Sequence, residues 1–309
     1  MDFAVIGGDK RFAWLAKRLR ECGRDARTLD GAPGVENPAP KLTWKELGRA
    51  RNVIMNVPRP DSDAILNRLS AGTRVFFMGP GEPDGVPDDI RAVNLWKDER
   101  LLCENAYLTA EGAIAAAMRA GERAIKDCEC LIIGWGRIGK ALTELLVGMN
   151  AAVTVASRSE RGRNGAIERG AQTADTAELE SALSGKQIVF STPPARVLDE
   201  RRLRAVDEDA MVIDLSSAPY GVDLDTARRM SIRAWREPGL SGKILSAKRG
   251  WRVKCTTRDA KRFCWTFVYG KWVCRSRLWS ANSRSVLGNI LPVKWVGRMM
   301  ATEPCGKWS

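Results

Sequence analysis

Three closely spaced glycines are the residues of this sequence that most clearly indicate a functional site. Gly134, Gly136 and Gly139 follow the apolar run 130–133 and open an amphipathic segment. In such a strand–loop–helix unit, the first glycine permits a tight turn and the third lets the helix pack on the strand. The second lets the backbone approach a pyrophosphate, whose charge faces the helix N–H groups. The pattern predicts a dinucleotide site; the alternative is a tight turn without a ligand. The expected site comprises Gly134, Trp135, Gly136, Arg137, Ile138 and Gly139.

The residues after the next strand, 152–156, indicate which dinucleotide binds. An NAD site usually has an acidic residue there for the ribose 2′-hydroxyl. This chain has Ser157, Arg158 and Ser159, with Arg161 and Arg163 close behind. A guanidinium group and hydroxyls suit a 2′-phosphate, so we expect NADP, with NAD as the alternative. A solvated basic loop without a role in cofactor choice is the other interpretation.

Two further apolar runs, 187–190 and 211–213, each end in small polar residues. Ligands of open α/β sheets lie beyond the carboxyl ends of the strands. We therefore expect these residues to border the nicotinamide, although a plain turn role is equally compatible with Thr192 and Ser216. Asp214 is a candidate acid or base, or else a loop cap. The residues concerned are Thr192, Pro193, Asp214 and Ser216.

These residues must be positioned by alternating strands and helices. Buried strands are expected at 3–6, 52–56 and 74–78, and the second series includes 130–133 and 152–156. Alternation of this kind predicts parallel sheets, so the fold class is α/β with two Rossmann-like parallel-sheet domains and an atypical C-terminal tail. The Ala-rich segment 109–126 is expected to be a connecting helix, with Thr109 as its N-cap and Glu111 in its first turn.

Composition excludes several classes of protein. The 309 residues are 44% hydrophobic and 28% charged, as in soluble globular proteins, and no run approaches 18 apolar residues. The first residues do not form a basic segment followed by a long apolar one, so we expect no secretory signal. We also expect no membrane association. The sequence contains no histidine, which excludes Ser-His-Asp triads and His-ligated zinc. We expect no metal site.

The last 69 residues differ from the rest. Residues 241–309 contain 15 Lys and Arg but 2 Asp and Glu, so they hold the whole net charge of +13. They also contain six of the eleven tryptophans and four of the eight cysteines, without metal-ligand spacing. Only 263–274 suggests structure, a hairpin about Gly270. The other four cysteines, at 22, 103, 128 and 130, are expected to be buried thiols.

Five segments resemble the A subunits of dipicolinate synthase from spore-forming bacteria, over about residues 1–242. The resemblance implies the two-domain architecture of 2-hydroxyacid and alanine dehydrogenases. It places an N-terminal substrate domain at 1–108, a linker helix at 109–128 and an NADP-binding Rossmann domain at 129–240, with the tail at 241–309. The matching segments are 5–11, 105–113, 134–139, 214–223 and 238–240.

The resemblance also implies an activity. It implies NADP-linked oxidation, with aromatisation, of the dihydrodipicolinate-pathway intermediate to pyridine-2,6-dicarboxylate during sporulation. A flavoprotein-like B subunit would be the partner, in the cytoplasm of the mother cell, and a homo-oligomer is left open. Nucleic acid is not an expected partner of such an enzyme. A relative of shikimate or alanine dehydrogenase with another substrate is a weaker alternative, since fold does not fix chemistry.

A small dicarboxylate substrate requires cationic or N–H donors. Asp9, Lys10 and Arg11, after the first strand, are expected to face the cleft between the domains, where Arg11 could bind a carboxylate with two N–H groups. Asn105 and Thr109 belong to the matching linker motif and are further expected substrate contacts. Glu111 could orient substrate or take a proton. The alternatives are a surface charge for Arg11 and helix-terminal charge compensation for Glu111.

The chain departs from the resembled family after residue 243. The family continues with a Pro-containing, Ser/Thr-Ala-Gly segment and a helix that packs back on the body. Lys-Ile-Leu-Ser at 243–246 can be encoded so that a one-base slip gives Lys-Tyr-Tyr-Pro. We therefore expect residues from about 244 to be translated out of frame, which would disable the protein. The alternative is a genuine basic tail on a non-catalytic NADP-binding module, which binds nucleic acid by phosphate contacts and stacking.

Overall fold

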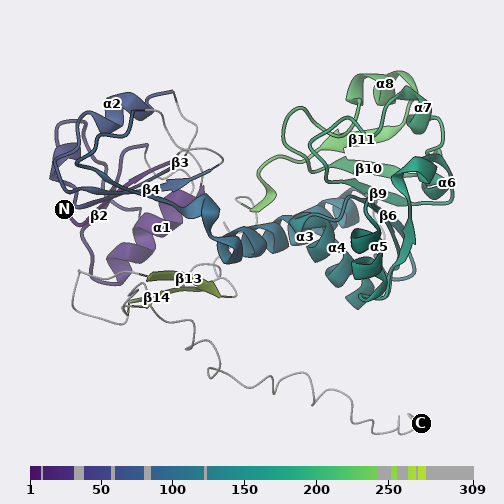
Figure 1. Ribbon diagram of the computed structural model, residues 1–309, viewed down its shortest axis with the longest axis horizontal. Helices are drawn as coiled ribbons and strands as arrows, with labels where there is room; N and C mark the ends of the chain where they lie inside the picture. The colour runs from purple at the N-terminus through teal and green to yellow at the C-terminus, as the bar shows by residue number, and fades with distance from the viewer. Residues whose placement is uncertain are drawn as a thin grey trace, which may run out of the picture.

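Two parallel sheets flank one long helix in the computed structural model of this chain (Figure 1). The predicted α/β class with two parallel-sheet domains is confirmed. Backbone and side chains are described for most of the first 241 residues, and backbone alone for three short tail strands. The described ranges are 1–7, 10–30, 38–56, 60–79, 85–121, 124–241, 252–255, 264–268 and 271–275.

The first sheet is entirely parallel and has the strand order β2-β1-β3-β4-β5. Every residue of β1 is buried, as expected for a strand covered on both faces. The order reverses direction between β1 and β3, and ligands bind at such a switch point in open α/β sheets. Its elements are β1 (Phe3–Ile6), α1 (Lys10–Glu21), β2 (Ala26–Thr28), β3 (Asn52–Asn56), α2 (Ser62–Leu66), β4 (Arg74–Met78) and β5 (Arg91–Asn94), with short 3-10 turns at Leu47–Arg49 and Leu95–Lys97.

The second sheet is also parallel, with the order β11-β10-β9-β6-β7-β8. This is the dinucleotide-binding strand order, with its switch point between β6 and β9. The strands are β6 (Glu129–Ile133), β7 (Ala152–Ala156), β8 (Gln172–Ala174), β9 (Ile188–Ser191), β10 (Met211–Asp214) and β11 (Arg233–Arg236). The helices are α4 (Arg137–Gly148), α5 (Glu160–Ile167), α6 (Leu179–Leu183), α7 (Glu200–Leu203) and α8 (Leu224–Arg229), with a 3-10 turn at Thr176–Glu178.

Helix α3 (Glu99–Gly121) connects the two sheets and starts ten residues before the expected N-cap at Thr109. Asp98 caps it instead, because its Oδ1 accepts the N–H groups of Arg100 and Leu101 at 3.0 and 3.2 Å. Thr109 lies inside the helix and its hydroxyl donates to the carbonyl of Asn105, at 2.8 Å. The predicted capping role of Thr109 and the first-turn position of Glu111 are therefore wrong.

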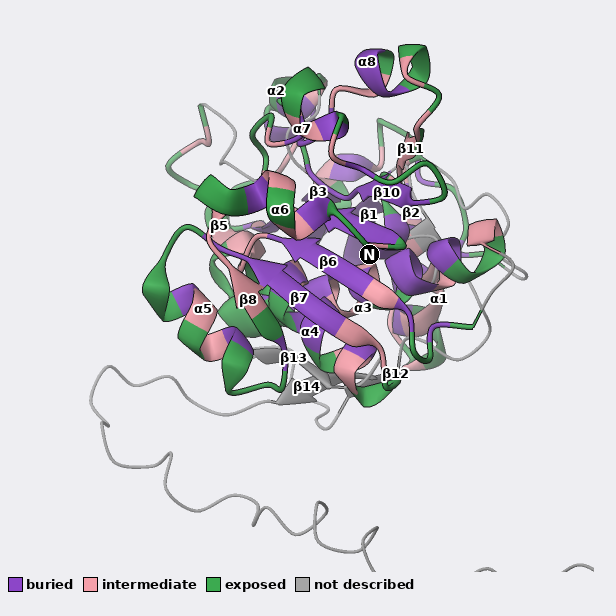
Figure 2. Ribbon diagram, turned by 90° about the vertical axis from the view of Figure 1, so that its right-hand side faces the viewer, coloured by how far each residue is buried: buried purple, intermediate pink, exposed green. Residues whose placement is uncertain are grey.

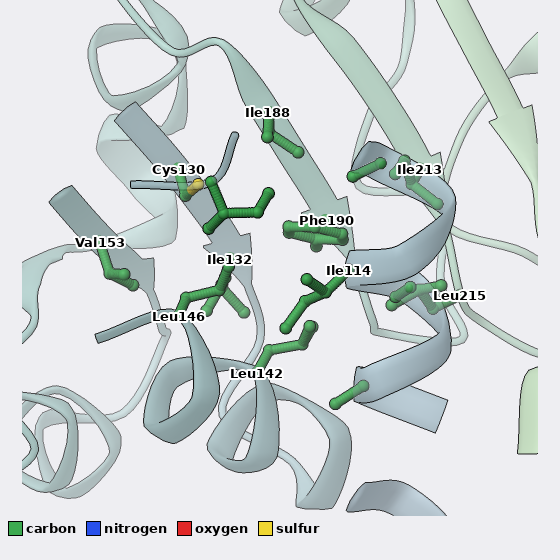
Figure 3. Packing of buried hydrophobic residues seen from close by; sticks show 14 of the residues in the cluster. Ile114, Cys130, Ile132, Leu142, Leu146, Val153, Ile188, Phe190, Ile213 and Leu215 are labelled. Atoms are coloured by element: carbon green, nitrogen blue, oxygen red, sulfur yellow. The ribbon is translucent and has the colours of Figure 1, made fainter. Parts of the chain in front are cut away.

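The Ala-rich part of α3 packs on the second sheet. Ala110, Ala113 and Ala117 are fully buried, and such small side chains let the helix approach its neighbours closely. Figure 3 shows Ile114 of α3 and Leu142 of α4 beside Phe190 of β9. The strands beneath, β6 and β7, are drawn as buried along most of their length in Figure 2. This core fixes α3 and α4 against one face of the sheet.

The four cysteines whose side chains are described are free thiols, and only part of the burial prediction holds for them. Cys128 and Cys130 are buried and Cys22 is half-buried, but Cys103 is exposed on α3. Burial raises the pKa of the Cys130 thiol to about 12, which leaves it unreactive at neutral pH. Cys103 was predicted wrongly because its helix begins earlier than expected and turns this position to solvent.

The predicted hairpin in the tail is present as two antiparallel strands, β13 (Cys264–Val268) and β14 (Lys271–Arg275). A third strand, β12 (Arg252–Cys255), runs parallel to β14. The tail's other residues, on which the frame and nucleic-acid hypotheses depend, lie outside the described residues. Within the described ranges, no helix has the length and apolar character of a membrane span. The same ranges hold no cluster of three or more metal-ligating side chains.

Candidate functional site

The glycine loop after β6 has the geometry that a dinucleotide requires. Gly134 has φ +99°, and a Cβ there would lie 2.6 Å from Thr192 Oγ1. A Cβ on Gly139 would lie 2.1 Å from the carbonyl oxygen of Gly134, so α4 packs directly on the loop. A Cβ on Gly136 would meet nothing within 4 Å. Two glycines thus serve packing, and the middle one leaves its backbone open to a ligand.

The start of α4 fits a pyrophosphate at this open position. Gly136 is the N-cap residue, and its position has no side chain that could accept the first helical N–H groups. These N–H groups and the positive end of the helix dipole are the usual phosphate-binding elements of this fold. The loop therefore can hold the pyrophosphate of a dinucleotide.

The other side chains of the loop contact protein elements. Trp135 lies against Gly165 of α5, where a Cβ would be 3.0 Å from the indole nitrogen, and Arg169 lies 5.3 Å from its ring centroid. Arg137 donates two hydrogen bonds to Glu99, at 2.8 and 2.7 Å, which links α4 to α3. Ile138 is half-buried against the core. These three residues hold the loop between its neighbouring helices.

A pocket of about 740 Å³ lies beside Trp135 along α5, at the carboxyl end of β7. It is lined by Ser159, Arg161 and Lys140, among others. Ser159 caps α5 by accepting the N–H of Gly162 at 3.1 Å. Arg158 and Arg161 are exposed, whereas Ser157 is buried. Lys140 was not predicted, although its place directly after the third glycine brings it to this end of the loop.

Arg163 does not share the exposure of Arg158 and Arg161. Its guanidinium donates to the carbonyl of Ser157 at 2.8 Å and forms an ion pair with Asp175 at 2.5 Å. It therefore braces the loop from within. Exposed cations at this end of the site include Arg158, Arg161, Arg169 and Lys140.

The residues after β9 support the glycine loop. The Thr192 hydroxyl donates to the carbonyl of Ile133, the last residue of β6, at 2.9 Å. Pro193 lies beside Gly134, since a Cβ on that glycine would be 3.1 Å from its ring. Both predicted residues thus lie next to the loop, where they fix the relative position of the two strand ends.

The residues after β10 form a buried hydrogen-bonded corner. Asp214 is 0% exposed, and its carboxylate accepts the N–H and O–H of Ser216, at 3.1 and 2.6 Å. Ser216 Oγ accepts the N–H of Gly221 at 2.7 Å. The second carboxylate oxygen of Asp214 accepts Nε–H of Arg236 at 3.3 Å. Asp214 and Ser216 thereby fix the loop 215–221 at the carboxyl edge of the sheet.

Three distant segments meet where the two sheets face α3. Arg11, in the first turn of α1, donates from one Nη to Asn105 Oδ1 of α3 at 3.3 Å and to Ser241 Oγ at 3.2 Å. Ser241 is 4% exposed and was not among the predicted site residues. Thr109 follows Asn105 by one helical turn, so both face the same side of α3.

The remaining predicted substrate residues are placed differently. Asp9 lies outside the described residues. Glu111 is exposed, and it follows Thr109 by two positions, which turns it about 200° around the helix. It therefore points away from the face that carries Asn105 and Thr109. Direct proton transfer from a substrate held at Arg11 to Glu111 does not suit this arrangement.

One comparison with known proteins concerns α3 and most of the second sheet. Residues 99–223 match the family model of the D-isomer specific 2-hydroxyacid dehydrogenase NAD binding domain. This match covers helix α3, the glycine loop and the strands from β6 to β10. Residues 99–223 are thus similar to the NAD-binding domain of a dehydrogenase family, which supports a nicotinamide dinucleotide as the cofactor.

The longer matches agree with the resemblance found in the sequence. The dipicolinate synthase A subunit of Bacillus subtilis (strain 168) is 26% identical over 276 residues, covering 81% of this chain and 92% of that protein. The structure of the corresponding protein from Bacillus halodurans has a TM-score of 0.66 at 19% identity, covering 79% of this chain and 95% of that chain. The structure of the Bacillus subtilis protein has a TM-score of 0.63 at 22% identity, covering 80% and 93%. The resemblance to the A subunits of dipicolinate synthase is confirmed.

Proposed function

We propose that this chain is an NADP-linked oxidoreductase that aromatises a small cyclic dicarboxylate, as the A component of a dipicolinate synthase. The observation that carries the proposal is the open backbone at Gly136, set at the switch point of a Rossmann sheet. The similarity to the A component of a known dipicolinate synthase, over 81% of the chain, supports the choice of substrate.

The reaction requires little from the protein's own acids and bases. A dihydropyridine dicarboxylate loses one hydride and one proton, and pyridine-2,6-dicarboxylate results. The bound nicotinamide supplies the hydride acceptor. No alcohol has to be deprotonated, which is compatible with a chain that has no histidine.

In this proposal the chain's own residues bind and orient the substrate and the cofactor. Arg11 and Asn105 bind one substrate carboxylate, beside Thr109, and the loop held by Asp214 and Ser216 shapes the nicotinamide end. We assign Asp214 as a positioning residue because it is buried and both of its carboxylate oxygens accept hydrogen bonds from the protein. The exposed Glu111, which points away from Asn105 and Thr109, has no direct proton-transfer role in this proposal.

The cofactor proposal is NADP, with its 2′-phosphate at Arg158 and Arg161. A titration of the double variant Arg158→Gln/Arg161→Gln with NADPH and NADH tests it by cofactor fluorescence. We expect NADPH affinity to fall about tenfold to a hundredfold, since hydrogen bonds to charged groups are lost, and NADH affinity to change little. Arg201→Gln, an exposed arginine of α7, is the control. Equal losses for both dinucleotides would contradict the assignment.

The partner in this proposal is the second, flavoprotein-like subunit of dipicolinate synthase, and the setting is the cytoplasm of a sporulating mother cell. Co-expression of both proteins and copurification through a tag on either one tests the pairing. Failure to copurify, for a chain that binds NADPH, would remove this part of the proposal.

The deciding experiment is an activity assay on the full chain together with the flavoprotein-like partner. The freshly made product of dihydrodipicolinate synthase and NADP are supplied, and pyridine-2,6-dicarboxylate and NADPH are measured. We expect both to form in equal amounts. The same assay is run on a chain whose reading frame is restored after residue 243, because the tail there departs from the resembled family. If the chain as given and the frame-restored chain both bind the cofactor but neither makes product, the proposed reaction is overturned.

A further inference from the structure

A second arginine, Arg236 at the carboxyl end of β11, is held at the edge of the second sheet. Its Nε donates to Asp214 at 3.3 Å, and its guanidinium carbon lies 3.5 Å from the centroid of the Tyr220 ring. Its side chain is 28% exposed. Within the described part of the chain, its two terminal Nη groups have no hydrogen-bond partner. The guanidinium is thus held from two sides, while part of the Arg236 side chain stays exposed.

Asp214, one of the two partners that hold Arg236, is itself fixed by hydrogen bonds. Asp214 is fully buried and bonded to Ser216, whose Oγ also accepts the N–H of Gly221. Tyr220 has φ +71°, a conformation that a residue with a side chain adopts only under local constraint. Preorganisation of this kind lowers the entropy that is lost when an anion binds.

A short segment of chain links Arg236 to a hydrogen-bond partner of Arg11. Ser241, which accepts a hydrogen bond from Arg11, follows Arg236 by five residues. Even if extended, this segment spans at most about 17 Å, and a turn shortens it. Leu240, 3% exposed, anchors the segment in the core beside α3. In Figure 1 the light-green chain after β11 runs back toward α3. This short link limits how far apart the two arginines can lie, with Arg11 contributed by the first unit and Arg236 by the second.

We propose that Arg236 binds the second carboxylate of the substrate, while Arg11 binds the first. The inference rests on the proposed function and adds to it a second residue that recognises the dicarboxylate, which would bridge the two domains. A guanidinium suits this task because two of its N–H groups match the two oxygens of a carboxylate, a geometry that an ammonium group lacks. A monocarboxylic acid would engage only one of the two arginines.

Calorimetry on the full chain saturated with NADPH tests the proposal, with pyridine-2,6-dicarboxylate and pyridine-2-carboxylate as probes. We expect the wild type to prefer the dicarboxylate. Arg236→Gln should weaken dicarboxylate binding on the order of 10- to 100-fold and abolish the preference, since a charge-assisted pair is lost. Arg236→Lys should restore only part of it. Arg228→Gln, which changes an exposed arginine of α8, is the matched control and should bind like wild type.

The outcomes separate this inference from the proposed function. A wild type that binds NADPH but does not prefer the dicarboxylate would overturn the proposed substrate. A wild-type preference that persists in Arg236→Gln would overturn only the role of Arg236. Arg236→Gln leaves the buried Asp214 charge unpaired, so the double variant Asp214→Asn/Arg236→Gln is also tested, with NADPH titration as the check on folding. It should show the same loss of preference.

Discussion

The two α/β units begin with the same strand–glycine junction but use it differently. Ile6-Gly7 and Ile133-Gly134 each end a buried strand. Five residues after each glycine stands Phe12 in the first unit and Gly139 in the second. A Cβ on Gly7 would lie 2.2 Å from the Phe12 ring, so that ring fills the space beneath the first junction. At the second junction the helix backbone itself packs on the loop, and Gly136 stays open.

The comparison shows which position separates a packed turn from a nucleotide site. Both junctions carry a glycine, and both lie beside the point where strand order reverses. The residue five positions later decides whether a side chain or a ligand uses the available space. In our proposal the first unit contributes Arg11 for substrate and the second contributes the cofactor loop.

The largest effect is expected for Gly139→Ala. The added Cβ would lie 2.1 Å from the carbonyl oxygen of Gly134. Because this oxygen belongs to the backbone, it cannot move aside as easily as a flexible side chain could. We expect a loss of about 1–3 kcal/mol in the free energy of unfolding, typical of overpacking, together with loss of cofactor binding. Urea denaturation and NADPH titration measure the two effects. Unchanged NADPH affinity in the variant would contradict the idea that close packing of α4 on the loop shapes the cofactor site.

A smaller and more selective effect is expected for Gly136→Ala. Its φ of −79° suits any residue and its Cβ would contact nothing, so we expect the free energy of unfolding to change by less than about 1 kcal/mol. NADPH affinity should still fall at least about tenfold, because the methyl group occupies the pyrophosphate position. Equal NADPH affinity in the variant and the wild type would argue against this loop as the cradle.

Gly7→Ala tests the glycine junction of the first unit. The added methyl group must displace the buried Phe12 ring, which we expect to cost about 1–3 kcal/mol in the free energy of unfolding. The cofactor loop belongs to the other sheet, so NADPH affinity of the folded protein should not change. A tenfold weaker NADPH affinity would show that the two units do not divide their roles in this way.

The smallest effect is expected for Glu99→Gln, which removes the ion pair with Arg137. The hydrogen bond from Arg137 lowers the pKa of Glu99, so the pair stabilises the fold above the ordinary Glu pKa and loses this contribution as the pH falls. Both side chains are exposed, so we expect the melting temperature at pH 7 to fall by less than about 2 °C. The difference from wild type should vanish in acid, and a growing difference there would contradict the assignment.

Local features were predictable because they depend on neighbours in the chain. The three glycines, the exposed Arg158 and the strand ends at Thr192 and Asp214 follow from spacing and from the alternation of apolar runs. The start of α3 was not predictable, because a helix start depends on which cap competes best, and Asp98 caps the helix eleven residues before Thr109.

The sequence by itself determined the α/β class, the glycine cradle and the parallel strands that carry it. Only the tertiary structure decided which side chains meet across the chain. Arg11 reaches Ser241, 230 positions away, and Arg236 pairs with Asp214 through the adjacency of β10 and β11. Such contacts are set by sheet order and helix packing, which bring together residues that no local pattern relates.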